Sequence, residues 1–162
     1  MDAQTAQNEP VADRELIVTR VYDAPARLLF LAYAKPEHVM KWFGPKGWPL
    51  TKCEMDFRVG GEFHFAMTGP EGEAGPPFGG KYLEIVPDKK VAYDNGFEAP
   101  GNGRMQVTVT FDEQDGRTTL TVSTVFDTVA MKDEYVGLGM VEGMNSGFDN
   151  LEDVVAALKA GA

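Results

Sequence analysis

The sequence predicts an α+β fold in which one antiparallel sheet packs against a long C-terminal helix. Between residues 53 and 126, apolar side chains recur at every second position in short runs that glycines and prolines separate, as in half-buried strands. Between residues 140 and 158 they recur at every third or fourth position, as on one face of a helix. The apolar sheet face and the apolar helix stripe bury each other when the helix lies across the sheet.

The chain begins with a predicted strand and two short helices. Residues 15–22, ELIVTRVY, are rich in β-branched and apolar side chains, which favour a strand. Asp23 and Pro25 are residue types found at helix starts. Pro36 ends the first helix and begins the second. The two helices and the FGPKGWP loop after them are expected at residues 27–34, 36–42 and 43–49.

Six further strands are expected after this loop. The alternation is clearest in the last two, with Val107, Val109 and Phe111 on one arm and Leu120 and Val122 on the other. Consecutive strands joined by short turns pair in antiparallel fashion, so we expect one sheet of about six to seven strands. The predicted ranges are 53–58, 62–68, 80–86, 90–97, 105–111 and 118–126.

The last predicted element is an amphipathic helix of about 20 residues. The segment before it, residues 129–138, also favours a helix that is broken near Gly137 and Gly139. One face of the last helix is polar and acidic, and the other forms an apolar stripe. The stripe consists of Met140, Met144, Phe148, Leu151, Val155 and Leu158.

The chain of 162 residues has the size of one domain. It contains no internal repeat, low-complexity run or linker, so we expect a single domain over residues 14–162 and a flexible polar tail over residues 1–13. No apolar run approaches the roughly 20 residues that cross a bilayer, and no secretory signal is recognisable. The cytoplasm is therefore the expected compartment, and a route to the cell surface that leaves no mark in the sequence stays open.

The charge and the rare residue types exclude several classes of function. The net charge is −10, which disfavours binding to nucleic acid and to anionic membranes. A single cysteine, Cys53, excludes a disulfide framework and a cysteine-rich zinc module, and we expect it to be a buried, unreactive thiol. His38 and His64 are too few for a multi-histidine metal site. The glycines of residues 137–143 lack the βαβ context of a dinucleotide site, so we expect no metal and no cofactor.

Tyr82 and Glu84 are the weak candidates for catalysis. Two positions apart on a regular strand, they share a face, and if that face is buried the pKa of the carboxyl rises towards the range of a general acid or base. Leu83 and Ile85 alternate with them, however, and apolar residues normally occupy the inner face. An outward-facing, solvated Glu84 is therefore the alternative.

Five stretches of the sequence resemble, in this order, the START-like or SRPBCC superfamily, and within it the branch named after the activator of heat-shock chaperone ATPase. The resemblance covers residues 14–160 and implies the helix-grip fold, a curved antiparallel sheet wrapped around the C-terminal helix. Members of this superfamily have many functions, so the resemblance predicts fold better than function. The stretches are RVYDAPARLLFLAYAKPEHVMKWFGP (20–45), MDFRVGGEFHFAMTGPEG (55–72), GGKYLEIVPDKKVAY (79–93), VTVTFDEQDGRTTLTV (107–122) and EGMNSGFDNLEDVVAAL (142–158).

The resemblance also implies a deep cavity between the sheet and the C-terminal helix. The surfaces that face each other carry large phenylalanine and methionine side chains, which suit varied apolar ligands. The alternative is that these side chains fill a dry core. The predicted cavity residues are Trp42, Trp48, Phe63, Phe65, Met67, Tyr82, Glu84, Tyr93, Met140, Met144 and Phe148.

Three hypotheses for the function follow, in order of preference. The first is a small soluble protein that binds an apolar or amphipathic small molecule, without catalysis. The second is an enzyme of the cyclase or lyase type that uses Tyr82 and Glu84 or a cavity water for proton transfer. The third, supplied by the name of the resembled branch alone, is a co-chaperone of a heat-shock chaperone. A homodimer through a sheet edge or the FGP loop stays open.

Overall fold

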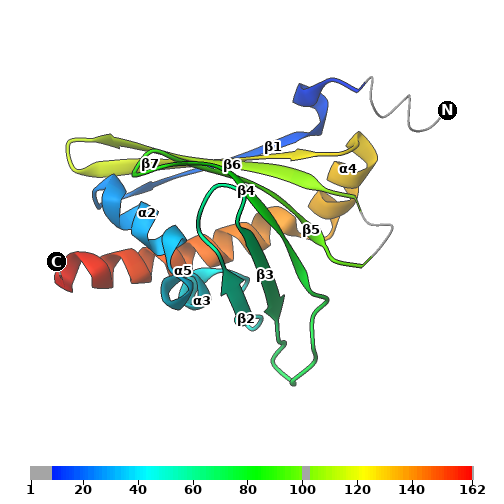
Figure 1. The fold of residues 1–162 in the computed structure, drawn as a ribbon, viewed down its shortest axis with the longest axis horizontal. Helices are drawn as coiled ribbons and strands as arrows, with labels where there is room; N and C mark the ends of the chain where they lie inside the picture. The colour runs from blue at the N-terminus through cyan, green and yellow to red at the C-terminus, as the bar shows by residue number, and fades with distance from the viewer. Residues whose placement is uncertain (1–8, 100–102, 162) are drawn as a thin grey trace.

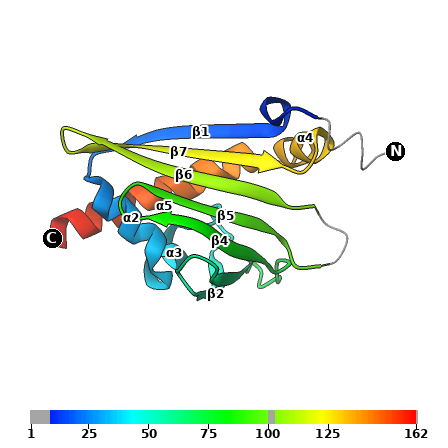
Figure 2. The same cartoon turned by 45° about the horizontal axis from the view of Figure 1, so that its top comes forward.

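The computed structural model describes residues 9–99 and 103–161 and has the predicted α+β architecture. Seven antiparallel strands form one sheet that curves around the long C-terminal helix (Figure 1). Two short helices follow the first strand and cover part of the same concave side (Figure 2). The elements are η1 (Val11–Arg14), β1 (Glu15–Tyr22), α2 (Ala26–Ala34), α3 (Pro36–Trp42), β2 (Leu50–Met55), β3 (Glu62–Met67), β4 (Phe78–Val86), β5 (Lys90–Phe97), β6 (Met105–Gln114), β7 (Arg117–Phe126), α4 (Val129–Gly137) and α5 (Met140–Gly161).

The order of the strands is β1-β7-β6-β5-β4-β3-β2. From β2 to β7 each strand pairs with the next one along the chain, and β1 closes the far edge by pairing with β7. The order and the element types confirm the helix-grip prediction. None of the described helices has both the length and the apolar character that a membrane-spanning helix needs.

The strand register is explained by a row of valines on the concave face. Val18 of β1 lies opposite Val122 of β7, Val122 opposite Val109 of β6, and Val109 opposite Val91 of β5. All four pack in the core cluster that also contains Leu151 of α5, which is fully buried. A slip of one residue in any of these pairs would turn that strand's apolar side chains to solvent. Burial of this row therefore fixes the register of half the sheet.

Helix α5 lies close to both α3 and β1. A Cβ atom at Gly147 would lie 3.2 Å from the main-chain oxygen of Trp42, so a larger side chain there would push α3 away. The hydroxyl of Tyr22, at the end of β1, donates a hydrogen bond of 3.0 Å to the carbonyl of Phe148. Both contacts hold α5 against the concave face and position the end of α3, where the candidate site begins.

The described part of the predicted tail, residues 9–13, packs against the rest of the domain. Residues 1–8 of the predicted tail lie outside the described residues, and the rest of the tail makes specific contacts through η1. Arg14 donates hydrogen bonds to the carbonyls of Phe126 and Glu9, at 2.8 and 3.2 Å. The Glu9 carboxylate accepts the amide of Val129, the first residue of α4, at 3.1 Å. Glu9 thus binds the first amide of α4. The polar sequence around Glu9 does not predict this contact.

Candidate functional site

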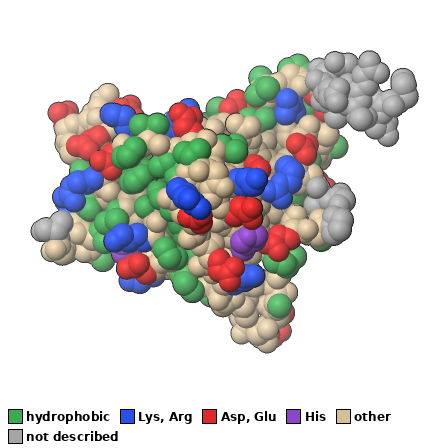
Figure 3. All heavy atoms as spheres, viewed as in Figure 1, with side chains coloured by type: hydrophobic (Ala, Val, Ile, Leu, Met, Phe, Trp, Pro, Cys, Tyr) green, Lys and Arg blue, Asp and Glu red, His purple; other side chains and the backbone are tan. Residues whose placement is uncertain are grey.

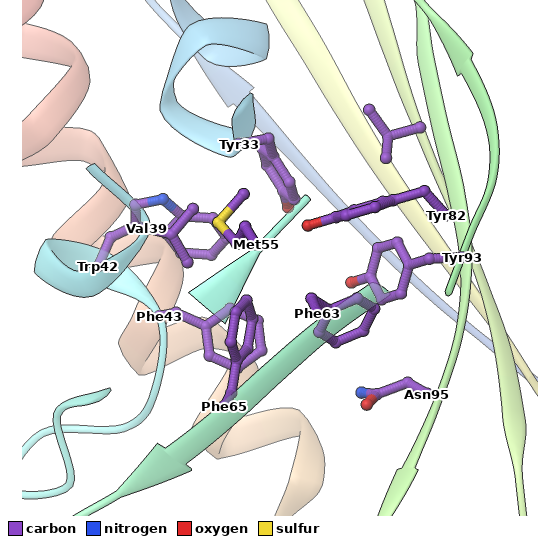
Figure 4. A pocket seen from close by; sticks show the side chains of 11 residues that line it. Tyr33, Val39, Trp42, Phe43, Met55, Phe63, Phe65, Tyr82, Tyr93 and Asn95 are labelled. Atoms are coloured by element: carbon purple, nitrogen blue, oxygen red, sulfur yellow. The ribbon is translucent and has the colours of Figure 1, made fainter. Parts of the chain in front are cut away.

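A small cavity lies between helices α2 and α3 and strands β2 to β5 (Figure 4). The volume accessible to the centres of water molecules in this cavity is about 30 Å³. One water needs roughly 10–15 Å³ by this measure, so the cavity has room for about two waters. Most of the lining is apolar. The lining residues are Tyr33, Val39, Trp42, Phe43, Met55, Phe63, Phe65, Tyr82, Val91, Tyr93 and Asn95.

Aromatic rings make up most of the cavity wall and lean on one another edge to face or at a tilt. The ring centroids of Phe63 and Tyr93 are 5.4 Å apart, with the ring planes at 89°. Those of Phe43 and Phe65 are 5.5 Å apart, at 67°. Such spacings are favourable for aromatic pairs. The wall is therefore suited to contact with a ring-shaped molecule.

Trp42 is the best-anchored member of the wall. Its indole N–H donates a hydrogen bond of 3.0 Å to the carbonyl of Ala32 in α2, and only 4% of the residue is exposed. Its ring packs against Tyr33, with centroids 4.8 Å apart, and stacks on Phe148 of α5 at 6.4 Å. Trp42 therefore connects the cavity to α2 and α5, and its orientation is set by contacts on several sides.

Tyr82 is positioned by the loop between β2 and β3. The amide of Gly60 donates to the carbonyl of Tyr82 at 2.8 Å, and the amide of Tyr82 donates to the carbonyl of Gly61 at 2.9 Å. A Cβ atom at Gly61 would lie 2.0 Å from the main-chain oxygen of Asp56, so this turn requires glycine. The loop therefore takes the place of a neighbouring strand and holds the ring of Tyr82 over the cavity.

Three tyrosine hydroxyls face the cavity. Figure 4 shows the side chains of Tyr33, Tyr82 and Tyr93 converging there, with the hydroxyls of Tyr33 and Tyr82 pointing toward one another. No group among the described residues forms a hydrogen bond with these hydroxyls. Burial raises the pKa of all three phenols well above the usual value of 10.0. They are therefore protonated at neutral pH and act as hydrogen-bonding groups, not as bases.

Asn95 adds the only carboxamide of the described wall. It lies on β5, two residues after Tyr93, on the same face of the strand. Its Oδ1 atom is buried and has no hydrogen-bond partner among the described residues. Nearly all buried polar atoms in native proteins are paired, and an unpaired one needs a specific explanation.

The described cavity wall contains three tyrosine hydroxyls and one carboxamide. It contains no ionisable group that changes charge near neutral pH. Its described residues include no carboxylate, imidazole, amine or thiol. Nor do the described residues contain a cluster of three or more histidine, cysteine or acidic side chains placed to hold a metal ion. The cavity therefore offers shape, aromatic surface and neutral hydrogen-bonding groups.

A family model matches residues 23–156 of this fold, and its description is Activator of Hsp90 ATPase homolog 1-like protein. The chain belongs to this family. The match spans α2 through most of α5 and so includes every element that lines the cavity. It confirms the resemblance to the START-like or SRPBCC superfamily. A search of curated proteins finds no match.

Solved structures similar to this family member share its whole architecture. A protein from Nitrosomonas europaea is 26% identical, with a TM-score of 0.83 over 92% of this chain and 98% of that one. A protein from Arthrobacter aurescens is 24% identical, with a TM-score of 0.83 over 93% of this chain and 90% of that one. The AHSA1 protein from Silicibacter pomeroyi is 20% identical, with a TM-score of 0.74 over 88% and 98%. The latter two similarities concern the fold alone.

Five of the residues predicted for the cavity of this AHSA1-like protein do line it: Trp42, Phe63, Phe65, Tyr82 and Tyr93. The three on β3 and β5 follow the simple alternation of strand faces. Their contact with a ligand stays a prediction.

The prediction that Tyr82 and Glu84 share a face is wrong. Tyr82 pairs with Tyr93 and Glu84 pairs with Ala92. Between these two pairs, β4 therefore contains one more residue than β5. This β-bulge turns Glu84 to the convex face, where its side chain is 50% exposed and forms an ion pair of 2.9 Å with Lys90. Glu84 therefore does not belong to the cavity, and the proposed acid–base pair does not form.

Five other predicted residues also lie outside the described lining. Phe148 is buried behind Trp42, and Met140 and Met144 of α5 are half-buried against the core. Trp48 and Met67 lie near the glycines of the neighbouring loops: a Cβ at Gly75 would lie 3.6 Å from the Trp48 ring, and one at Gly44 would lie 3.3 Å from Met67 Cε. The cavity lies under α3, not under the start of α5, and this explains why these large side chains do not reach it.

Six lining residues were not foreseen. Two of them follow the strand alternation and were available to sequence reasoning: Met55 precedes Phe57 by two, and Asn95 follows Tyr93 by two. No local sequence pattern predicts that the helical and loop residues line the cavity, because this depends on how the helices pack on the sheet. The six are Tyr33, Val39, Phe43, Met55, Val91 and Asn95.

The convex face of β3 to β5 carries ion pairs. Figure 3 shows acidic, basic and histidine side chains interspersed on this side of the molecule. His64 lies here, as strand alternation predicted, with its ring nitrogens 2.9 Å from Glu98 and 3.3 Å from Glu62. The hydrogen bond with Glu98, followed by the weaker effect of Glu62, raises the imidazole pKa above 6.5. This cluster is a solvated surface network.

Cys53 lies on β2 and is half-buried against the core. Burial raises the pKa of its thiol to about 11, so the thiol is protonated at neutral pH. The thiolate is the reactive form, and the raised pKa agrees with the expectation of an unreactive cysteine.

Proposed function

We propose that this protein binds a neutral, largely apolar small molecule that contains a ring, in the cavity between α3 and strands β2 to β5. The observation that carries the proposal is the convergence of seven aromatic side chains on one space, together with a lining residue, Asn95, whose buried Oδ1 atom has no hydrogen-bond partner among the described residues. A core that serves stability alone is favoured by tight apolar packing and avoids unsatisfied polar atoms.

The chemistry of the wall supports a neutral ligand. A buried charge is costly unless an opposite charge or several hydrogen bonds compensate it. The described lining offers no charged partner. Aromatic rings, methionine and valine favour apolar surface, and the hydroxyls and the carboxamide favour a small number of neutral polar groups.

The present size of the cavity implies that binding requires a rearrangement. Ligand-binding cavities usually have a volume of about 300–1,000 Å³. The volume accessible to water centres in this cavity is only about 30 Å³. Phe43 and Met55 are only half-buried and lie on the loop after α3 and on the edge strand β2. They are free to move at lower cost than the fully packed Trp42, Phe63 and Phe65. We infer that Phe43 and Met55 move outward when a ligand enters.

Binding explains this wall better than proton transfer does. The tyrosine hydroxyls have raised pKa values, and Glu84 lies on the other face of the sheet. A catalytic role would need a proton donor or acceptor supplied by the ligand itself. Contact with a heat-shock chaperone remains a prediction that rests on the family name, and a change in chaperone ATPase rate on mixing would test it.

The test is a thermal-shift titration with a panel of neutral one-ring compounds. A ligand that binds only the folded state raises the Tm in proportion to its concentration relative to Kd. Val91→Met fills part of the cavity, and we expect it to abolish the shift. Val21→Met, the same change at a residue that is 50% exposed on β1, is the matched control. Absence of any shift across the panel, or equal shifts in wild type and Val91→Met, would contradict the proposal.

A further inference from the structure

The carboxamide of Asn95 is out of place for a residue of the protein core. It follows Val91 and Tyr93 on the concave face of β5, and these three alternate residues all line the cavity. Asparagine is depleted in strands, and an amide among apolar residues conflicts with both the local pattern and the packing around it. Such local conflicts concentrate at functional sites.

The surroundings of Asn95 do not compensate for its burial. Its Oδ1 atom is buried and accepts no hydrogen bond from the described residues. The neighbouring carboxylate of Asp94 faces the opposite side of β5, where it accepts hydrogen bonds from the amide of Lys81 and from the guanidinium of Arg104, both at 2.9 Å. The two adjacent residues thus differ sharply: the Asp94 carboxylate accepts hydrogen bonds from two groups of the protein, whereas Asn95 lines the cavity and has an unused acceptor.

We propose that Asn95 determines specificity by accepting a hydrogen bond from a hydroxyl group of the ligand. This inference rests on the proposed function and narrows it to neutral ring compounds that carry a hydroxyl, such as phenols. In Figure 4 the Asn95 side chain lies apart from the hydroxyls of Tyr33 and Tyr82, with the phenylalanine rings along the wall between α3 and β5. A ring in the cavity would contact these rings and direct its hydroxyl to Oδ1.

A neutral hydroxyl is favoured over other polar groups for two reasons. Oδ1 is an acceptor only, so the ligand must donate. An ammonium group would donate as well, but its charge would be buried against a lining that has no described carboxylate. A ligand that lacks a donor leaves Oδ1 unpaired, and sites with a buried hydrogen-bonding group discriminate strongly against such analogues.

The experiment compares p-cresol with toluene, which differ by one hydroxyl, in wild type and in Asn95→Leu. Dissociation constants are obtained from NMR titrations of the protein amides. The ratio of the toluene Kd to the p-cresol Kd is measured in each protein, and the quotient of the two ratios cancels the different hydration of the probes. We expect this quotient to be about tenfold or more. Gln106→Leu, an amide-to-leucine change at an exposed position of β6, is expected to keep the wild-type ratio.

The outcomes separate the two proposals. If neither probe binds wild type at millimolar concentration, the proposed function fails for this ligand class and the role of Asn95 falls with it. If both probes bind and the quotient is near one, the cavity binds ligands but Asn95 does not recognise the hydroxyl group, and the inference about Asn95 is wrong. Asn95→Val, which has a strand-favouring side chain, replaces Asn95→Leu if the latter does not fold, with the same expected quotient.

Discussion

Tyr82 and Glu84 lie two residues apart on β4 and face opposite sides of the sheet, because a β-bulge separates them. Tyr82 is held over the cavity by hydrogen bonds with the loop at Gly60 and Gly61, while Glu84 pairs with Lys90 in solvent. The bulge therefore gives the cavity a phenol and leaves the carboxylate outside, which favours recognition of a neutral ligand over acid–base chemistry.

Replacement of Glu84 by glutamine is expected to have little effect. An exposed ion pair such as Glu84–Lys90 contributes about 0–1 kcal/mol to stability, and the side chain has no access to the cavity. We expect the free energy of unfolding in urea to fall by less than about 1 kcal/mol and the Kd for p-cresol to stay within twofold. A tenfold loss of affinity would place Glu84 in the binding site and contradict the bulge.

Asn95→Leu is expected to stabilise the protein in the absence of ligand. The substitution removes an unpaired buried acceptor, whose desolvation costs about 1–3 kcal/mol, and leucine has a similar volume. We expect an increase of about 1 kcal/mol in the free energy of unfolding, measured by urea denaturation with Gln106→Leu as control. Destabilisation by Asn95→Leu would mean that the carboxamide has a partner within the protein.

Trp42 is expected to matter far more for stability than Trp48. Trp42 is 4% exposed, donates a hydrogen bond to Ala32 and contacts rings from α2 and α5. Trp42→Ala should cost about 3–5 kcal/mol, the usual range for a large buried ring. Trp48→Ala, at a half-buried loop residue, should cost less than half as much. Equal losses in chemical denaturation would show that the cavity wall is not anchored as described.

The His64 network is expected to make a small contribution to stability that disappears at alkaline pH. Glu98 and Glu62 raise the imidazole pKa in the folded state above 6.5. The folded state therefore binds the proton more tightly than the unfolded state, so the stabilisation is complete below pH 6.5 and is lost as the pH rises through the raised pKa.

The measurement for His64 is the difference in unfolding free energy between wild type and His64→Gln at pH 5.5 and at pH 8.5. We expect wild type to be favoured by less than about 1 kcal/mol at the lower pH, because the pair is exposed, and by nothing at the higher pH. His38→Gln is the matched control at the other histidine. A difference that grows with pH would reverse the assigned sign.

The fold was predictable from the sequence because its main signals are local. The alternation of apolar residues places Val107 and Val109 on the concave face of the sheet. The apolar stripe of α5 can be buried only against this apolar face. The same alternation correctly places Phe63 and Phe65 in the cavity wall. These patterns reflect burial, and burial also sets the register through the valine row.

The details of the site were not predictable because they depend on contacts between distant segments. The bulge after Tyr82 is a feature of the pairing of β4 with β5, and Tyr82 itself is hydrogen-bonded to the loop at Gly60 and Gly61, about twenty residues earlier in the chain. Tyr33 and Phe43 reach the cavity through the packing of α2 and α3 on the sheet, which no local period encodes. Met55 and Asn95 were the exceptions, since strand alternation places them on the same faces as Phe57 and Tyr93.

The most direct test of the account is the position of bound p-cresol, determined from intermolecular NOEs in a protein with labelled methyl groups. We predict NOEs from the ring protons to the methyls of Val39, Val91 and Met55, which line the cavity. NOEs to Val154 and Leu158 instead, in the surface groove between α3 and α5, would contradict a ligand site within the sheet.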